Sequence, residues 1–303
     1  GMAENTVKKI ATRESYGNSL KELAEEFPNL VVLDADLAAA TKTGIFRKAY
    51  PDRHIDCGIA ESNMMGVAAG LSLVGKIPFV SSFAMFAAGR AFEQVRNSIG
   101  YPHLNVKIGA THAGITVGED GATHQCNEDI ALMRTIPGMV VMCPSDDVEA
   151  RAAVRAALEY EGPVYIRFGR AAVPVINDHP GYHFEIGKGT VVREGKDVTI
   201  VATGICVDSA LGAAKMLEEE GISAEVVNIC TIKPLDEEII INSAKKTGKV
   251  VTVEEHSVIG GLGSAVCDCL CANHPVPVKK VGMQDVFGES GSAAALVEKY
   301  GLD

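Results

Sequence analysis

The densest group of reactive side chains lies in residues 111–125, which read Thr-His-Ala-Gly-Ile-Thr-Val-Gly-Glu-Asp-Gly-Ala-Thr-His-Gln. The stretch holds two histidines, His112 and His124, and two acids, Glu119 and Asp120. Histidines and carboxylates are the side chains that most often act as general acids and bases in catalysis. A compact domain rarely keeps so long a non-periodic loop without a use. We predict a functional loop, and a solvated surface loop is the alternative.

A second candidate is Glu61, in the sequence Cys57-Gly-Ile-Ala-Glu-Ser-Asn-Met. It stands at the start of an apolar, Ala- and Gly-rich helical pattern that we expect to be largely buried. Burial disfavours the charged form of a carboxyl group unless a positive or protonated group meets it. The alternative, which is favoured on Glu61 alone, is a first-turn glutamate that interacts with the helix dipole.

Two aromatic side chains, Phe83 and Phe86, are three residues apart just after a strand-like run. Core packing explains most such pairs, but open α/β sheets bind ligands at the positions that follow parallel strands. Arg167 and Arg170 also follow a strand-like run. A guanidinium there can bind a phosphate through two nitrogens, and an ordinary surface ion pair is the alternative.

Two further motifs are weak. Gly261-Leu-Gly263 precedes a helical pattern, but Val266 stands where a dinucleotide fingerprint needs a small residue, so we expect a tight turn and a helix N-terminus. Cys267, Cys271 and His274 have a mid-helix spacing that matches no common zinc site. We therefore predict no metal ligands there.

The surrounding pattern alternates strands with helices, which is typical of α/β domains with mostly parallel, twisted sheets flanked by helices. A turn-rich stretch near residues 176–182 separates two such patterns. We predict one domain over residues 1–175, a linker over 176–188 and a second domain over 189–303. The expected strands are 31–34, 78–82, 106–110, 140–143, 164–167, 198–202, 224–228, 250–254 and 278–281. The expected helices are 15–26, 61–74, 91–98, 127–134, 147–159, 209–220, 236–247 and 263–272.

Composition excludes several classes. The 303 residues carry a formal net charge of −11 and no tryptophan, which argues against binding to nucleic acid. No run of about 18 apolar residues is present, so we expect no membrane span. Eight cysteines without a signal-peptide pattern predict a reduced, cytoplasmic protein.

Taken together, the motifs resemble the C-terminal half of transketolase, and the resemblance covers essentially the whole chain. They are Lys9-Ile-Ala-Thr-Arg13, Ala35-Asp36-Leu37, Gly58-Ile-Ala-Glu61-Ser-Asn-Met, Phe83-Ala-Met-Phe86, Gly118-Glu-Asp-Gly-Ala-Thr-His-Gln125 and Arg170. Each is a modest signal, but their order and spacing are highly specific. The implied fold is a pyrimidine-binding domain followed by a transketolase C-terminal domain.

The resemblance implies thiamine diphosphate as cofactor and transfer of a two-carbon ketol unit between sugar phosphates. Glu61 matches the family glutamate that hydrogen-bonds the aminopyrimidine ring and so assists proton removal from the cofactor. Phe86 matches the ring that stacks on the pyrimidine, and Phe83 lines the same pocket. Asp36 resembles the family acid at the cofactor's edge, while a third family aromatic corresponds to Gly89.

For the substrate, His124 resembles the catalytic histidine that holds the hydroxyls of the donor ketose. Asp120 resembles the acid that binds an acceptor hydroxyl. His112, Arg170 and Arg13 resemble the groups that bind the sugar phosphate. A phosphate-contacting serine of the family corresponds to Ala40 here, which implies weaker phosphate recognition or a different phosphorylated sugar.

The family binds the diphosphate and its metal, Mg²⁺ or Ca²⁺, through a Gly-Asp-Gly turn, which does not occur in this sequence. We therefore interpret the chain as one subunit of a split transketolase. An N-terminal partner subunit supplies the metal and diphosphate ligands, and we expect the chain to pair with itself as well, in a heterotetramer.

Three alternatives remain open. A deoxyxylulose phosphate synthase is disfavoured by the single His124 followed by Asn127-Glu-Asp, and a 2-oxoacid dehydrogenase beta-like subunit is disfavoured by the long loop from His112. A non-catalytic regulatory subunit is disfavoured because Glu61 and the presumed substrate ligands are all present.

Overall fold

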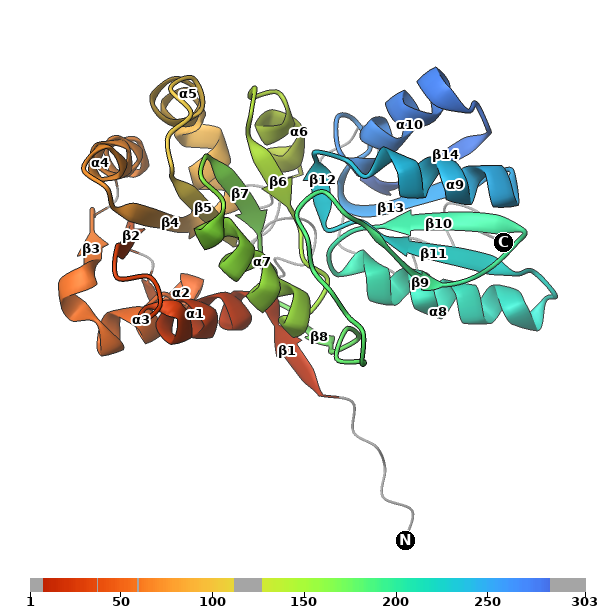
Figure 1. The fold of residues 1–303 in the computed structure, drawn as a ribbon, viewed down its shortest axis with the longest axis horizontal. Helices are drawn as coiled ribbons and strands as arrows, with labels where there is room; N and C mark the ends of the chain where they lie inside the picture. Colours follow the sequence, from red (N-terminus) through yellow and green to blue (C-terminus); the bar gives the residue numbers. More distant parts are fainter. Residues whose placement is uncertain (1–7, 37, 59, 112–126, 284–303) are drawn as a thin grey trace, which may run out of the picture.

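The computed structural model describes residues 8–36, 38–58, 60–111 and 127–283. Within these ranges the chain forms a larger sheet, a smaller sheet beside it, and a short two-stranded pair (Figure 1). The expected fold class, α/β with mostly parallel sheets flanked by helices, is confirmed. None of the described helices is both long and apolar enough to cross a bilayer.

The larger sheet has the spatial order β12-β6-β7-β5-β4-β2-β3. All its neighbouring strands are parallel except β12, which runs antiparallel to β6. The strands are β2 (Leu30–Asp34), β3 (His54–Asp56), β4 (Ile77–Phe83), β5 (Lys107–Thr111), β6 (Val140–Met142), β7 (Val164–Arg167) and β12 (Thr231–Lys233).

Helices cover both faces of this sheet, so its strands are apolar on both sides. On strand β2, Val31 and Leu33 belong to one hydrophobic core, and Val32 belongs to the other. The first core is covered by α4 (Glu61–Leu73), α5 (Phe92–Gln94), the π-helical η2 (Met85–Arg90) and η3 (Val95–Gly100), and α6 (Asp129–Arg134). The second is covered by α1 (Thr12–Leu23), α3 (Gly44–Ala49) and α7 (Asp147–Glu159). In Figure 1 the first group lies above the sheet and the second below it.

The smaller sheet has the order β14-β13-β10-β11-β9, and only β9 is antiparallel to its neighbour. Its strands are β9 (Thr190–Arg193), β10 (Val198–Ala202), β11 (Ala224–Asn228), β13 (Val250–Ser257) and β14 (Val278–Met283). Helices α8 (Cys206–Glu219), α9 (Glu237–Thr247) and α10 (Leu262–Asn273) pack against it. As expected, the Gly261-Leu-Gly263 stretch forms the start of a helix, α10.

A short antiparallel pair joins β1 (Lys9–Ala11) to β8 (Ala172–Pro174). It places the start of α1 beside the end of β7, where Gly169 donates its backbone N–H to Thr12 Oγ1 at 2.7 Å. The pair therefore brings together two segments that are about 160 residues apart in sequence and that hold Arg13 and Arg170.

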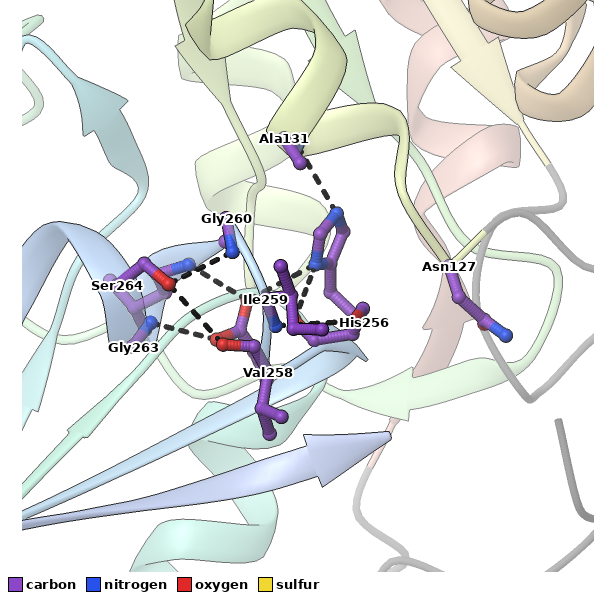
Figure 2. A network of polar contacts seen from close by, with 12 residues as sticks. Asn127, Ala131, His256, Val258, Ile259, Gly260, Gly263 and Ser264 are labelled. Carbon is purple, nitrogen blue, oxygen red and sulfur yellow. Dashed lines mark hydrogen bonds and ion pairs between the residues drawn. The ribbon is translucent and has the colours of Figure 1, made fainter. Parts of the chain in front are cut away.

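The two sheets are joined by polar contacts between α6 and the end of β13 (Figure 2). The His256 ring points toward α6, where its Nε2 accepts the Ala131 N–H at 3.2 Å. Arg134 donates from Nη1 to the Gly260 carbonyl at 2.6 Å, and Ser257 donates its N–H to the Asn127 carbonyl.

Several features differ from the sequence-based expectation, and three of them bear on the site or on assembly. The segment expected as one helix at 91–98 consists of a short α5 followed by a π-helical turn. Strand β12, from the second half of the chain, completes the sheet of the first half. Helix α4 was expected to be largely buried, but Gly66, Gly70 and Leu73 on one of its faces are exposed in the single chain. The division into residues 1–175 and 189–303 stays a prediction.

Candidate functional site

The predicted site residues that the structure describes lie along one edge of the larger sheet, at the carboxyl ends of its parallel strands. Strand pairing aligns Asp34 with Asp56 and Ser81, and Phe83 with Thr111. Because parallel strands all end at the same edge, the segments that follow them converge there. Asp36 follows β2, Glu61 follows β3, Phe83 ends β4 and Arg170 follows β7.

Glu61 is the first residue of α4, and its exposed fraction is only 5%. The preceding residue, Ala60, offers no side-chain cap, and no described residue hydrogen-bonds the Glu61 carboxylate. A carboxylate whose only role is to interact with a helix dipole is normally solvated, since burial without a partner is costly. The geometry therefore favours a carboxylate that is kept for a ligand.

Asp36 is exposed, and its backbone has a φ of 60°, in the left-handed region. Its N–H donates to Asp56 Oδ1 at 3.0 Å, and the N–H of Gly58 donates to the same oxygen at 2.9 Å. The Asp56 carboxylate thus ties together the turns that lead to Asp36 and Glu61. Sequence reasoning missed Asp56, although an aspartate two residues before a glycine is a recognised turn signal.

Two aromatic residues, Phe83 and Phe86, were predicted to lie in the same pocket as the Glu61 carboxylate. Phe83 is half-buried at the end of β4, next to the strand that precedes His112. Phe86 lies in η2, and its side chain is outside the described part of the structure. Gly89 is exposed, and an added Cβ there meets only Met85 Sδ at 3.8 Å, so nothing described fills the place of a family aromatic.

Arg13 and Arg170 come together at the junction of α1 and β7. The Arg13 backbone N–H donates to the Gly169 carbonyl at 3.1 Å, and Arg13 Nη1 donates to the Ala40 carbonyl at 2.9 Å. Burial lowers the pKa of Arg13, and the nearby positive charge of Arg170 lowers it further. Two adjacent guanidinium groups repel each other and favour a bound anion, and their fork geometry suits a phosphate.

Arg167, also singled out in the sequence, has a different place. It is buried, forms an ion pair with Asp129 at 3.0 Å, and donates to the Glu255 carbonyl. The bond from Arg167 to the Glu255 carbonyl is a contact between the two halves of the chain.

Three predicted substrate ligands, His112, Asp120 and His124, lie outside the described residues, within 112–126. Their roles stay predictions. Among the residues that are described, no group of three or more His, Cys, Asp or Glu side chains is arranged to hold a metal ion.

Comparison with protein families decides the identity of the fold. The family model described as "Transketolase, pyrimidine binding domain" matches residues 8–175, and "Transketolase, C-terminal domain" matches residues 187–303. The chain belongs to the transketolase family. The resemblance inferred from the motifs is therefore confirmed.

Two curated relatives that match along nearly their full length also carry transketolase names. A putative transketolase C-terminal section of Methanocaldococcus jannaschii is 53% identical over 293 residues, covering 96% of this chain and 92% of the relative. A 6-deoxy-6-sulfo-D-fructose transketolase subunit of a Clostridium species is 50% identical, covering 96% of this chain and 90% of the relative.

Solved structures agree with this assignment. A structure described as a split gene transketolase, inactive beta4 tetramer, is 61% identical, has a TM-score of 0.88, and is matched over 97% of this chain and 94% of that chain. The transketolase of Campylobacter jejuni is 26% identical with a TM-score of 0.79, and this chain spans 46% of that chain.

Proposed function

We propose that this chain is the C-terminal subunit of a split transketolase that transfers a two-carbon ketol unit between sugar phosphates, together with an N-terminal partner subunit. The observation that carries the proposal is the buried Glu61 carboxylate, which no described residue hydrogen-bonds, at the ligand-binding edge of a pyrimidine-binding fold. Thiamine diphosphate, when bound, supplies a nucleophilic carbon that carries the two-carbon unit.

This chain's own residues bind and orient the cofactor's pyrimidine end. Glu61 holds a proton against the ring nitrogen, which its burial makes effective because few waters compete for that hydrogen bond. Phe83 and Phe86 form the aromatic wall, and Asp36 lies at the edge. The fit of these residues to the cofactor rests on the buried Glu61 carboxylate and on the half-buried Phe83. Both lie at the same edge of the larger sheet.

The proposed substrates, sugar phosphates, are anionic. Arg13 and Arg170 bind the sugar phosphate with His112, and Asp120 and His124 bind hydroxyl groups. Although the net charge of the chain is −11, the Arg13 and Arg170 pair makes the potential locally positive. Such a reversal allows an acidic protein to bind anionic sugars.

The partner subunit is proposed to bind the diphosphate and its Mg²⁺ or Ca²⁺, because the Gly-Asp-Gly turn is absent from this sequence. Self-pairing is supported by the exposed face of α4, which includes Gly66, Gly70, Leu73 and Val74. An apolar helix face of this kind is normally covered by protein. The solved relative described as an inactive beta4 tetramer is in keeping with self-association and with a need for a partner.

The test is Glu61→Gln in the subunit pair reconstituted with thiamine diphosphate and magnesium. We expect kcat for ketol transfer to fall by about 10²- to 10⁴-fold, the usual contribution of a proton-transfer group. Glu225→Gln is the matched control, because Glu225 is a buried carboxylate of the smaller sheet, bonded to Ser243 and Lys246. Unchanged activity in Glu61→Gln contradicts a catalytic role and favours a regulatory subunit.

The donor panel separates the enzymatic alternatives. Consumption of fructose 6-phosphate supports transketolase, whereas consumption of pyruvate favours a deoxyxylulose phosphate synthase or a 2-oxoacid dehydrogenase. The panel includes 6-deoxy-6-sulfo-D-fructose, because a 50% identical relative bears that name and because Ala40 stands at a phosphate-contacting position of the family. No transfer with any donor by a folded, assembled pair contradicts the proposal.

A further inference from the structure

A buried polar network lies directly behind the candidate site, at the end of β2. Asp34 is fully buried there, and its carboxylate accepts hydrogen bonds from Thr41 Oγ1 at 2.9 Å and from Thr43 Oγ1. His54 Nε2, on the neighbouring strand β3, lies 3.0 Å from Asp34 Oδ2, and the side chain of His54 is 2% exposed. A buried carboxylate is tolerated when donors surround it in this way.

Thr41 and Thr43 belong to the segment that follows β2, residues 35–43, whose described part includes the short helix α2 (Ala38–Thr41). Their bonds to Asp34 tie this segment to the strands. Two residues of this segment, Asp36 and Lys42, have φ angles of 60° and 67°. Neither is glycine, so each conformation is unfavourable and persists only where the surroundings impose it. Asp36 and Lys42 are therefore held in conformations that they do not prefer by themselves.

Helix α1 also contacts this segment. A Cβ added to Gly17 would lie 2.3 Å from the Lys42 carbonyl oxygen, so only glycine allows this close approach. Arg13, one turn earlier on α1, donates to the Ala40 carbonyl at 2.9 Å. The segment is thus confined between the Asp34 network and α1.

We propose that Asp34, with Thr41, Thr43 and His54, is a positioning network that sets the place of Asp36 and the orientation of Arg13. The inference rests on the proposed function, because it assigns the network to the cofactor's edge and to the sugar phosphate. The Asp34 carboxylate holds Thr41 and Thr43, which fixes the neighbouring Ala40 carbonyl and the bond that this carbonyl accepts from Arg13. The network itself touches neither substrate nor cofactor.

The test compares Asp34→Asn, Thr43→Val and Thr43→Ser in the reconstituted subunit pair. Asp34→Asn removes the charge, Thr43→Val removes one donor at nearly constant shape, and Thr43→Ser keeps that donor. Glu225→Gln is the control, since Glu225 is 3% exposed and bonded to the Ser243 hydroxyl and to Lys246 in the other sheet. The Glu225→Gln variant therefore changes a buried carboxylate that has no contact with the described part of residues 35–43.

Two readouts are needed. Hydrogen exchange of the backbone amides in residues 35–43 does not depend on activity, and we expect it to accelerate about 10-fold or more in Asp34→Asn and Thr43→Val. In kinetics, the KM for the sugar phosphate and the half-saturating concentration of thiamine diphosphate are expected to rise about 10-fold, because a misplaced Arg13 or Asp36 loses a hydrogen bond to a charged group, and such a bond contributes about tenfold or more to binding. The kcat at saturation changes less than twofold.

Thr43→Ser is expected to behave as the unsubstituted pair, and Glu225→Gln is expected to leave the exchange of residues 35–43 and the KM unchanged. Equal exchange in Asp34→Asn and the unsubstituted protein overturns the inference, as does faster exchange with an unchanged KM. If the unsubstituted pair shows no ketol transfer, the proposed function fails. The exchange readout then still decides whether the network holds the segment.

Discussion

Asp129 and Arg167 form a buried ion pair with side-chain exposures of 0% and 5%. Tyr165 also donates its hydroxyl to Asp129 at 2.7 Å. Neutralising Asp129 removes a carboxylate charge that stabilises the buried Arg167 guanidinium, and breaking a buried ion pair of this kind costs about 3–5 kcal/mol. We therefore expect Asp129→Asn to lower the free energy of unfolding by that amount, measured by urea denaturation.

The comparison variant for this pair is Glu26→Gln. Glu26 forms a two-nitrogen ion pair with Arg155 at 2.8 Å, but both side chains are largely exposed. Exposed ion pairs contribute little, so the midpoint of unfolding should hardly change. A loss in Glu26→Gln as large as that in Asp129→Asn contradicts the argument from burial.

Two more buried residues, Glu254 and His256, make stability depend on pH. Burial raises the pKa of Glu254 to about 7, partly offset by the backbone N–H groups of Leu262 and Gly263, which donate to its carboxylate. Folded protein therefore keeps a proton that the unfolded chain releases, and this term lowers stability as pH rises from 4.5 to 7. Burial lowers the pKa of His256 to about 4, so its term raises stability from pH 4 to 6.5.

The contributions of Glu254 and His256 to the pH dependence of stability have opposite signs and partly cancel. Each contribution is therefore measured in a variant that lacks one of the two groups. The free energy of unfolding of Glu254→Gln minus that of the unsubstituted chain should rise by roughly 3 kcal/mol between pH 4.5 and 7. The same difference for His256→Gln should fall between pH 4 and 6.5. Denaturation at a series of pH values measures both, and a difference that does not vary with pH contradicts the assignment.

At the scale of the element, helix α4 carries the strongest prediction about assembly. Added Cβ atoms at Gly66 and Gly70 meet nothing within 4 Å in the single chain, so a larger side chain there does not disturb the fold of the chain itself. If this face packs against another chain, Gly70→Gln should reduce the assembled mass seen by light scattering while keeping the circular dichroism spectrum.

Gly212→Gln is the matched control for Gly70→Gln. Gly212 lies within α8, and an added Cβ there also meets nothing within 4 Å. Both variants gain similar helix propensity, so a difference between them reports the surface and not the helix. Equal assembly of the two variants contradicts the role of the α4 face.

At the scale of the whole molecule, the two halves share structure and should unfold together. Strand β12 completes the larger sheet, and Lys233 donates from Nζ to the carbonyls of Arg134 and Ile136 at 2.8 and 2.6 Å. Asn228 donates to Glu149 at 2.9 Å. We expect calorimetry to show one transition, which Asp129→Asn shifts to lower temperature without splitting. Two separate transitions in the unsubstituted chain contradict this coupling.

Much of the fold could be predicted because its signals are local. The run expected at 31–34 is β2 (Leu30–Asp34), and the helix expected at 147–159 is α7, with the side chain of Asp146 as its N-cap. Hydrophobic runs and caps need only neighbouring residues. By contrast, β12 is three residues long, and its partner β6 is about 90 residues earlier in the chain.

The candidate site divides in the same way. The sequence alone determined the family, the order of the motifs, and the positions of Glu61, Asp36, Arg13 and Arg170 at the ends of elements, because these depend on residue type and spacing. Tertiary structure decided that Glu61 is buried with no described hydrogen-bond partner, that Asp56 joins two turns, and that the Asp34 network confines residues 35–43. The physical reason is that burial and hydrogen bonding depend on which distant segments meet, and parallel strands bring those segments to one edge.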